Sequence, residues 1–274
     1  MKINLLLVPI LAMCSSAFGQ MDTIYINNEK LGVNVREITE DAVKYSYPNE
    51  DLINTTYKNS IQKIIYKNGR AQTFNEAKAY KQVQSINDFE NVSVTTLESD
   101  VKGLYKIGLL GATDLGSIFS NTEKVKDFAI KKIKMQAAML GANVVYITDS
   151  RNDGAKYGGY LTGYKGPESS ISGVAYTTNT VNFGSFLSKI GDKQNFEIVT
   201  IYSLAPNARS IKTTEVKTTA FQIIEIVEEN GLVTIEGRIK NEKNKFILAY
   251  FDNEYFYLYN QNKRSKSFQY KIKF

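Results

Sequence analysis

Apolar residues recur every three or four positions between residues 124 and 140, and this stripe is the clearest structural signal in the chain. The spacing predicts an amphipathic helix whose apolar side packs on a sheet. Ser120 and Glu123 fit a capping box, which predicts that the helix begins there. The stripe consists of Val125, Phe128, Ala129, Ile133, Ala137 and Leu140, and the lysines at 124, 126, 131, 132 and 134 lie mostly off it.

The same stretch predicts the end of the helix and the element after it. Gly141 is the expected terminator, because glycine adopts the left-handed conformation of a helix C-cap without a Cβ penalty. Residues 144–147 are β-branched or aromatic, and the run is too short for a second helix. We therefore expect a helix that turns directly into a buried strand.

Residues 20–74 are rich in short alternating runs. Asn-Asn, Glu-Asp, Pro-Asn and Asn-Gly turn signals separate these runs, which predicts a small SH3-like or Sm-like β module. Residues 75–87 are predicted to form a helical connector, because good helix formers such as Glu76 and Ala77 gather at its start. The predicted strands cover residues 23–26, 31–38, 42–47, 54–57 and 61–66.

Residues 88–205 are expected to form a central α/β domain around the helix. Strands are predicted at 92–97, 104–110, 174–182 and 196–204, with the last two closing the sheet. The stretch 149–173 is rich in glycine and contains Tyr157, Tyr160 and Tyr164. It is predicted to be either a mobile binding loop or a long hairpin whose glycines mark bends. As a binding loop, it would use these three tyrosines.

After a predicted linker at residues 206–214, residues 215–274 are again β-rich. Five strands are predicted, and Asn230-Gly231 is a typical hairpin turn because both residues tolerate positive φ. The expected fold class is therefore α+β and mostly β, with two small β-barrel or sheet modules flanking a central α/β sandwich domain.

The helix-to-strand junction MQAAMLGANVVYI (residues 135–147) resembles the corresponding junction of the YbjQ-like proteins and of the related core of envelope-stress lipoproteins. The resemblance covers roughly residues 92–204 and implies a small β-α-β domain found in the bacterial envelope. The stress-sensor branch uses core disulfides, which this chain lacks there, so metal binding and signalling are not carried over. The N-terminal segment also resembles a module of exported Bacteroidetes proteins.

Residues 1–19 have the pattern of a secretory signal peptide. Lys2 precedes a short apolar run, and Ala17 and Gly19 stand at the positions that signal peptidase reads. The prediction is an exported protein, periplasmic, outer-membrane-associated or secreted, without a transmembrane span. The alternative is a lipoprotein anchored at Cys14, although Met13 is larger than the residue that usually precedes a lipidated cysteine.

Composition narrows the chemistry. The chain has no histidine and a single cysteine, which excludes Ser-His-Asp and Cys-His catalysis and the usual zinc sites. No catalytic, cofactor-binding or metal-binding residue is predicted, and no cofactor is expected. A carboxylate pair of the glycoside-hydrolase kind remains open, but none of the 28 acidic residues is distinguished. The absence of tryptophan counts against carbohydrate sites built on stacking platforms.

The leading hypothesis is a non-enzymatic exported envelope protein that acts as a binding or assembly module through a β-edge or the Gly/Tyr loop. The alternatives are a carboxylate-based hydrolase and a structural subunit of an envelope assembly. The formal net charge of +6 indicates either a solvated surface or weak affinity for an anionic lipid or glycan. Another envelope protein is the other expected kind of partner, and nucleic acid is not expected for an exported protein. The sequence leaves the oligomeric state open.

Overall fold

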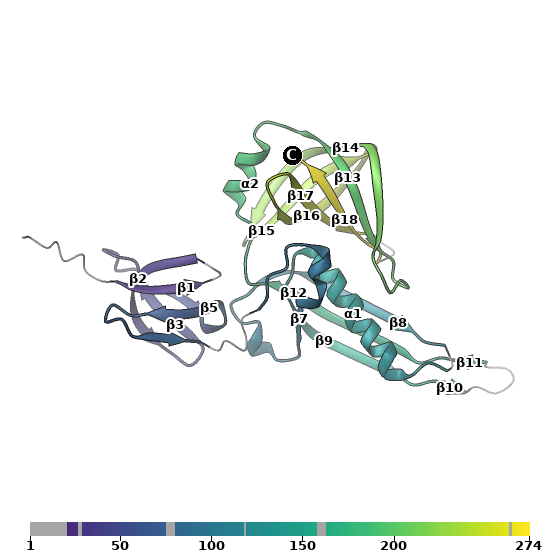
Figure 1. Cartoon of the computed structure of the whole chain (residues 1–274), viewed down its shortest axis with the longest axis horizontal. Helices are drawn as coiled ribbons and strands as arrows, with labels where there is room; N and C mark the ends of the chain where they lie inside the picture. The colour runs from purple at the N-terminus through teal and green to yellow at the C-terminus, as the bar shows by residue number, and fades with distance from the viewer. Residues whose placement is uncertain (1–20, 27–28, 75–79, 118, 158–162, 263–264) are drawn as a thin grey trace, which may run out of the picture.

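The computed structural model describes residues 21–26, 29–74, 80–117, 119–157, 163–262 and 265–274 (Figure 1). Strand makes up 54% of the described residues and helix 17%, which confirms the prediction of a mostly β, α+β fold. Three main sheets follow one another along the chain, and one long helix covers the middle sheet.

The N-terminal module is one antiparallel sheet in the order β4-β3-β2-β1-β5-β6. Every predicted strand of this region is present, and β6 adds a short sixth strand. Buried Asp22 ties the module together, since its carboxylate accepts the backbone N–H groups of Val35 and Lys67 at 2.9 and 2.8 Å. The strands are β1 (Asp22–Ile26), β2 (Glu29–Ile38), β3 (Ala42–Ser46), β4 (Asn54–Tyr57), β5 (Ile61–Ile65) and β6 (Ala71–Thr73), with the 3-10 turn η1 (Lys58–Ser60) before β5.

The connector differs from its prediction. Residues 75–79 lie outside the described residues, and residues 80–85 contain no helical turn. The first helical turn is the 3-10 helix η3 (Ile86–Asn91), which Ser85 caps by accepting the Asn87 N–H. Ile86 is buried against the middle core, so tertiary contact and not helix propensity shapes this segment.

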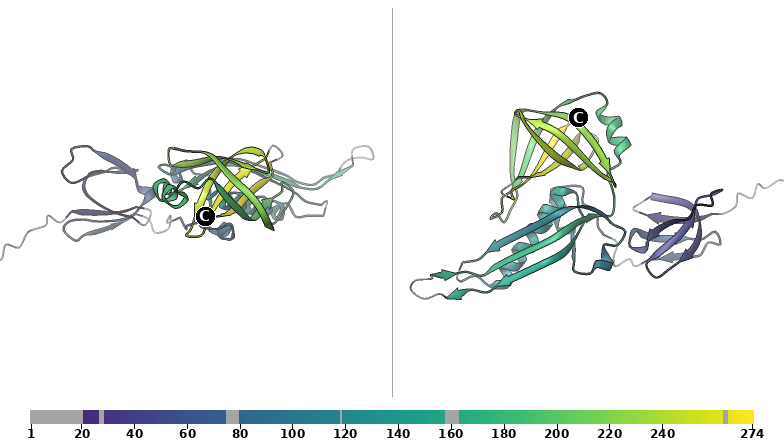
Figure 2. Two further views of the ribbon diagram at one scale, coloured as in Figure 1. Left: turned by 90° about the horizontal axis from the view of Figure 1, so that it is seen from above. Right: turned by 180° about the vertical axis from the view of Figure 1, so that it is seen from behind.

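The middle domain is a four-stranded sheet in the order β7-β9-β12-β8, with only β7 and β9 parallel. Helix α1 (Thr122–Leu140) lies along one face of it (Figure 2). The remaining elements are β7 (Ser93–Thr95), η4 (Glu98–Asp100), β8 (Tyr105–Leu115), β9 (Val144–Asp153), β10 (Lys156–Tyr157), β11 (Tyr164–Lys165) and β12 (Glu168–Thr177). The short helix α2 (Phe183–Ile190) follows and packs on the barrel.

Helix α1 ends as predicted but begins one residue later than the capping box suggested. Gly141 has φ of 84° and its N–H bonds the carbonyls of Ala137 and Ala138. The N-cap is Asn121, whose Oδ1 accepts the Glu123 N–H at 2.7 Å. The Ser120 hydroxyl instead accepts the Ser117 N–H and stabilises the preceding turn.

The Gly/Tyr-rich stretch forms a long hairpin, which is the second of its two predicted arrangements. Strands β9 and β12 pair from Val144 to Asp153, and β10 and β11 extend the hairpin beyond them. Gly173 marks the register shift, and a Cβ at this position would lie 2.7 Å from the Tyr146 carbonyl oxygen. Glycine is therefore required at this bulge.

The C-terminal region is a closed barrel of β13–β18. Its interior is filled by aromatic side chains such as Phe221, Phe246 and Phe256, and Phe186 of α2 packs against this core. The strands are β13 (Asn195–Leu204), β14 (Lys212–Glu229), β15 (Leu232–Ile239), β16 (Glu242–Phe251), β17 (Tyr255–Gln261) and β18 (Ser267–Lys273).

Two predictions about this region were wrong. Strand 196–204 does not close the middle sheet, because β13 pairs with β14 and β18 and so belongs to the barrel. Most of the predicted linker 206–214 is the turn between β13 and β14 and the start of β14. Alternation along a strand identifies the strand but not its partner, which explains both errors.

The middle domain and the barrel share one core. Leu204 and Tyr259 of the barrel are buried among the residues of α1 and the middle sheet. Gln269 of β18 is fully buried and donates to the Met139 carbonyl at 2.6 Å. These contacts bring the end of α1 against the barrel wall.

Candidate ligand-binding cleft

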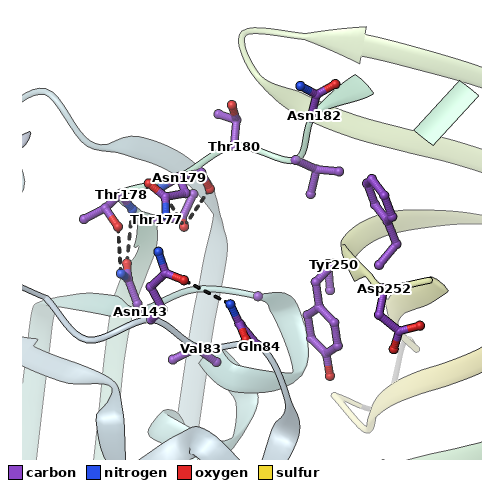
Figure 3. A pocket seen from close by; sticks show the side chains of 15 residues that line it. Val83, Gln84, Asn143, Thr177, Thr178, Asn179, Thr180, Asn182, Tyr250 and Asp252 are labelled. Atoms are coloured by element: carbon purple, nitrogen blue, oxygen red, sulfur yellow. Dashed lines mark hydrogen bonds between the residues drawn. The ribbon is translucent and has the colours of Figure 1, made fainter. Parts of the chain in front are cut away.

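A cleft of about 490 Å³ lies where the middle domain meets the barrel (Figure 3). Four chain segments line it: residues 82–84 before η3, the junction after α1, residues 177–182 after β12, and residues 249–252 at the end of β16. The middle domain and the barrel therefore both contribute walls of the cleft.

Asn143 fixes the wall on the middle-domain side. Its Nδ2 donates to Thr178 Oγ1 at 2.8 Å and to the Lys81 carbonyl at 3.3 Å, and its Oδ1 accepts the Thr178 N–H at 3.1 Å. Asn143 is almost completely buried, so this clamp holds the connector and the segment after β12 in fixed positions.

Gly141 sets the distance between the two walls. A Cβ at this position would lie 2.5 Å from the carbonyl oxygen of Ala249, so a larger residue would push the barrel away. The same glycine provides the left-handed C-cap of α1. The residues of the junction motif thus have physical roles. Gly141 ends the helix and allows the barrel to pack closely, and Asn143 holds one wall of the cleft in place.

Tyr250 contributes an aromatic ring to the barrel wall. Its hydroxyl donates to Gln269 Oε1 at 3.1 Å, and its ring lies 4.4 Å from that of Tyr257. Burial raises the pKa of Tyr250, so it remains a neutral hydrogen-bond donor. This network connects the cleft to the buried contact between β18 and α1.

The remaining lining is mostly side-chain amides and hydroxyls. Asn179 Oδ1 is buried and has no hydrogen-bond partner. Asp252 is the one carboxylate among the described lining residues, and its Oδ1 accepts the N–H groups of Glu254 and Tyr255 at 2.8 and 2.7 Å. Amide and hydroxyl groups both donate and accept, so the cleft is suited to hydrogen-bonding a neutral polar ligand. The polar lining comprises Gln82, Gln84, Asn143, Thr177, Thr178, Asn179, Thr180, Asn182, Tyr250 and Asp252.

The tyrosines predicted as a binding loop lie elsewhere. Tyr157 of β10 pairs with Tyr164 of β11, and Tyr160 lies outside the described residues. Tyr164 is 67% exposed. This hairpin extends from the start of β12 (Figure 1), whereas residues 177–182, at the other end of β12, line the cleft.

Sequence reasoning missed the cleft because it searched for charged and nucleophilic groups. The predicted strand 174–182 was wrong beyond its first residues, because β12 ends at Thr177. The signal available was the polar run Thr-Thr-Asn-Thr-Val-Asn at residues 177–182, which was assigned to that strand. Such a run resembles an ordinary polar loop until the barrel is placed opposite it. Asn182 also has a local role, since it caps α2 by accepting the Ser185 N–H at 2.8 Å.

A buried ionic cluster that the sequence also did not predict lies along the edge strand β8. Lys132 is 1% exposed, donates to the carbonyls of Thr113 and Pro206, and lies 3.6 Å from the Asp114 carboxylate. Arg209 of the β13–β14 turn binds both oxygens of Asp114, at 3.1 and 2.7 Å. Burial lowers the pKa of Lys132, and the charge of Asp114 opposes this shift.

This cluster closes part of the β8 edge. The Lys132 ammonium donates a hydrogen bond to the Thr113 carbonyl, and Arg209 Nη2 lies 3.4 Å from the Leu115 carbonyl oxygen. A strand added by a partner would need these carbonyls. Binding through the β8 edge, one form of the β-edge hypothesis, is therefore disfavoured at this end of the strand.

Comparisons of the chain with protein-family models, curated proteins and solved structures found no match. Within the described part of the chain, no group of three or more His, Cys, Asp or Glu side chains is placed to hold a metal ion. No helix among the described residues has the length and apolar character needed to cross a bilayer.

Proposed function

We propose that this protein is an exported, non-enzymatic binding protein whose ligand occupies the cleft between the middle domain and the barrel. The observation that supports this proposal is the cleft itself. Buried contacts from two domains hold amide and hydroxyl groups around one space of ligand size. Export and an envelope location belong to the proposal and rest on the N-terminal sequence pattern.

The lining supports binding over hydrolysis. A carboxylate-based hydrolase needs two carboxyl groups that face one bond of the substrate. The described lining offers Asp252 alone, and backbone N–H groups already occupy one of its oxygens. A hydrolase at this cleft therefore lacks the second group that the reaction requires.

A second role, as a subunit of an envelope assembly, is favoured by the N-terminal module. Leu52 and Ile53 are 68% and 58% exposed and stand directly before the edge strand β4. Exposed apolar residues beside an unpaired strand edge are typical of a surface that a protein partner covers. Membership of the YbjQ-like group stays a prediction from the junction motif.

The test is native mass spectrometry of the tagged protein recovered from its own envelope fraction. We expect the wild-type chain to carry a bound species that the cleft-filling variant Asn179→Trp lacks. The matched control Asn195→Trp changes an exposed asparagine outside the cleft and should retain that species. Equal occupancy of both variants, or no bound species on the wild-type chain, would contradict the proposal.

A further inference from the structure

We infer that the ligand of the cleft is a neutral saccharide of about two sugar units, held chiefly by hydrogen bonds to its hydroxyl groups. This inference rests on the proposed binding function and names its ligand class. It differs from the expectation of an anionic lipid or glycan, which came from net charge alone.

Charge is the first argument. No lysine or arginine is among the described residues that line the cleft. An anionic headgroup, phosphate or uronate would need such a partner when it leaves water. Asp252 does not create a cation site, because two backbone N–H groups and, at 3.5 Å, the Tyr257 hydroxyl already face its oxygens.

The mixture of donors and acceptors is the second argument. Side-chain amides and threonine hydroxyls each present both kinds of group, and so does every sugar hydroxyl. A peptide is usually bound through a strand edge that matches its regular N–H and C=O spacing. This lining instead consists of side chains from loops such as residues 177–182, which favours a saccharide over a peptide.

Asn179 is the third argument. Its Oδ1 is buried without a hydrogen-bond partner, although its backbone N–H and C=O both bond the Thr177 hydroxyl. A buried acceptor without a partner is unfavourable, and this oxygen has almost no accessible surface. A sugar hydroxyl in the cleft would donate to it after the Asn179 side chain turns toward the cleft that the residue lines. Asn179 lies on the same segment as Thr178, which the Asn143 clamp fixes (Figure 3).

Size completes the fit. A cleft of about 490 Å³ falls in the usual range for small-molecule sites and exceeds a single sugar unit. The chain has no tryptophan, and the aromatic residues of the lining, Tyr250 and Phe251, already pack against the rings of Tyr257 and Phe186. Hydrogen bonds therefore contribute more of the specificity here than stacking does.

The experiment is NMR titration of the mature chain, in which the side-chain amide signals of asparagine and glutamine are monitored. The neutral probes are cellobiose, maltose and di-N-acetylchitobiose, and the contrasting probes are digalacturonate and tetra-alanine. We expect at least one neutral disaccharide to shift the amide signals of Asn179 and Gln84 with a saturable curve. Asn179→Leu should weaken that affinity roughly tenfold, the loss expected for one buried hydrogen bond.

Matched variants separate loss of a contact from loss of the fold. Thr180→Val removes one lining hydroxyl at nearly constant shape and should weaken binding several-fold. Asn195→Leu and Thr213→Val make the same changes at exposed positions outside the lining and should leave the affinity unchanged.

The outcomes distinguish the inference from the proposed function. If only digalacturonate or tetra-alanine binds, and Asn179→Leu weakens that binding, the cleft binds a ligand but the inference of a neutral saccharide is wrong. If a saccharide binds equally to Asn179→Leu and to wild type, the inference is wrong because the site lies elsewhere. If no neutral disaccharide shifts the cleft signals at millimolar concentration, the inference is overturned, and recovery of the protein from its envelope fraction decides the binding function separately.

Discussion

The middle domain joins its two neighbours in opposite ways. Toward the barrel it shares a core that includes Leu204 and Tyr259, a buried ionic cluster and the fully buried Gln269. Toward the N-terminal module the polar contacts are exposed: Asn59 donates to the Ser99 and Lys102 carbonyls, and Lys102 pairs with Asp41 at 3.3 Å. The apolar contact there is the half-exposed ring of Tyr57 against Gly103. The barrel is therefore a structural part of the middle domain, whereas the N-terminal module is an attachment.

The difference arises from the surface that each interface removes from water. Burying apolar area contributes roughly 25 cal/mol per Å² and stabilises the middle–barrel contact whatever the salt concentration. An exposed ion pair contributes at most about 1 kcal/mol and is screened by salt. A ligand site can be held rigidly only at the first kind of interface, and that is where the cleft lies.

Removing whole modules should give the largest effect. A chain of residues 80–182 loses the barrel side chains that complete the middle core, so we expect it to unfold without a cooperative transition. A chain of residues 80–274 keeps that core and should unfold cooperatively. Both chains lack the N-terminal module, which has a core of its own. Thermal unfolding monitored by circular dichroism measures both, and a sharp transition of the 80–182 chain would contradict the shared-core interpretation.

Breaking the buried ionic cluster should have the next largest effect. Asp114→Ala leaves Lys132 charged and buried, and we expect a loss of about 3–5 kcal/mol in the free energy of unfolding. Adding Lys132→Met should recover part of the loss, because an apolar side chain then replaces the unpaired charge. Glu236→Ala removes the exposed pair with Lys243 and serves as the control in urea titrations. Equal losses for Asp114→Ala and Glu236→Ala would show that burial is irrelevant.

Two glycines with nearly equal φ differ in what surrounds them. Gly141 and Gly69 have φ of 84° and 81°, so alanine at either position costs about 1–2 kcal/mol from the backbone alone. A Cβ at Gly69 meets nothing within 4 Å, whereas one at Gly141 meets the Ala249 carbonyl of the barrel. Gly141→Ala should therefore lose more than about 3 kcal/mol in chemical unfolding, since overpacking adds to strain. Similar losses of unfolding free energy at both positions would mean that the barrel can shift away from Gly141 without an energetic cost.

The smallest effect is expected at the N-terminal junction. Lys102→Ala removes the exposed pair with Asp41 and should change the free energy of unfolding by less than about 1 kcal/mol. In a salt concentration of about 0.5 M, where the pair is screened, the variant should unfold at the same urea concentration as wild type. A shift above that size would show that the N-terminal contact is energetically stronger than its exposure indicates.

Local sequence signals were reliable for single elements. The stripe from Val125 to Leu140 and Gly141 placed α1 and its end, since helix periodicity and the left-handed cap are properties of adjacent residues. The alternating runs placed the N-terminal strands for the same reason. The capping residue was one position away from the prediction, because Ser120 is used by the preceding turn instead.

The way in which the elements combine depends on contacts between distant parts of the chain. The pattern of β13 identifies a strand, but its partners β14 and β18 are set by closure of the barrel. Lys132 resembles a solvated lysine in the sequence, yet it is buried because Asp114, Arg209 and two carbonyls surround it. The cleft exists because the barrel stands opposite residues 177–182. The sequence therefore determined the local elements and the absence of histidine chemistry. Long-range packing determined the site, because a contact between two distant segments leaves no periodic signal in the sequence of either segment.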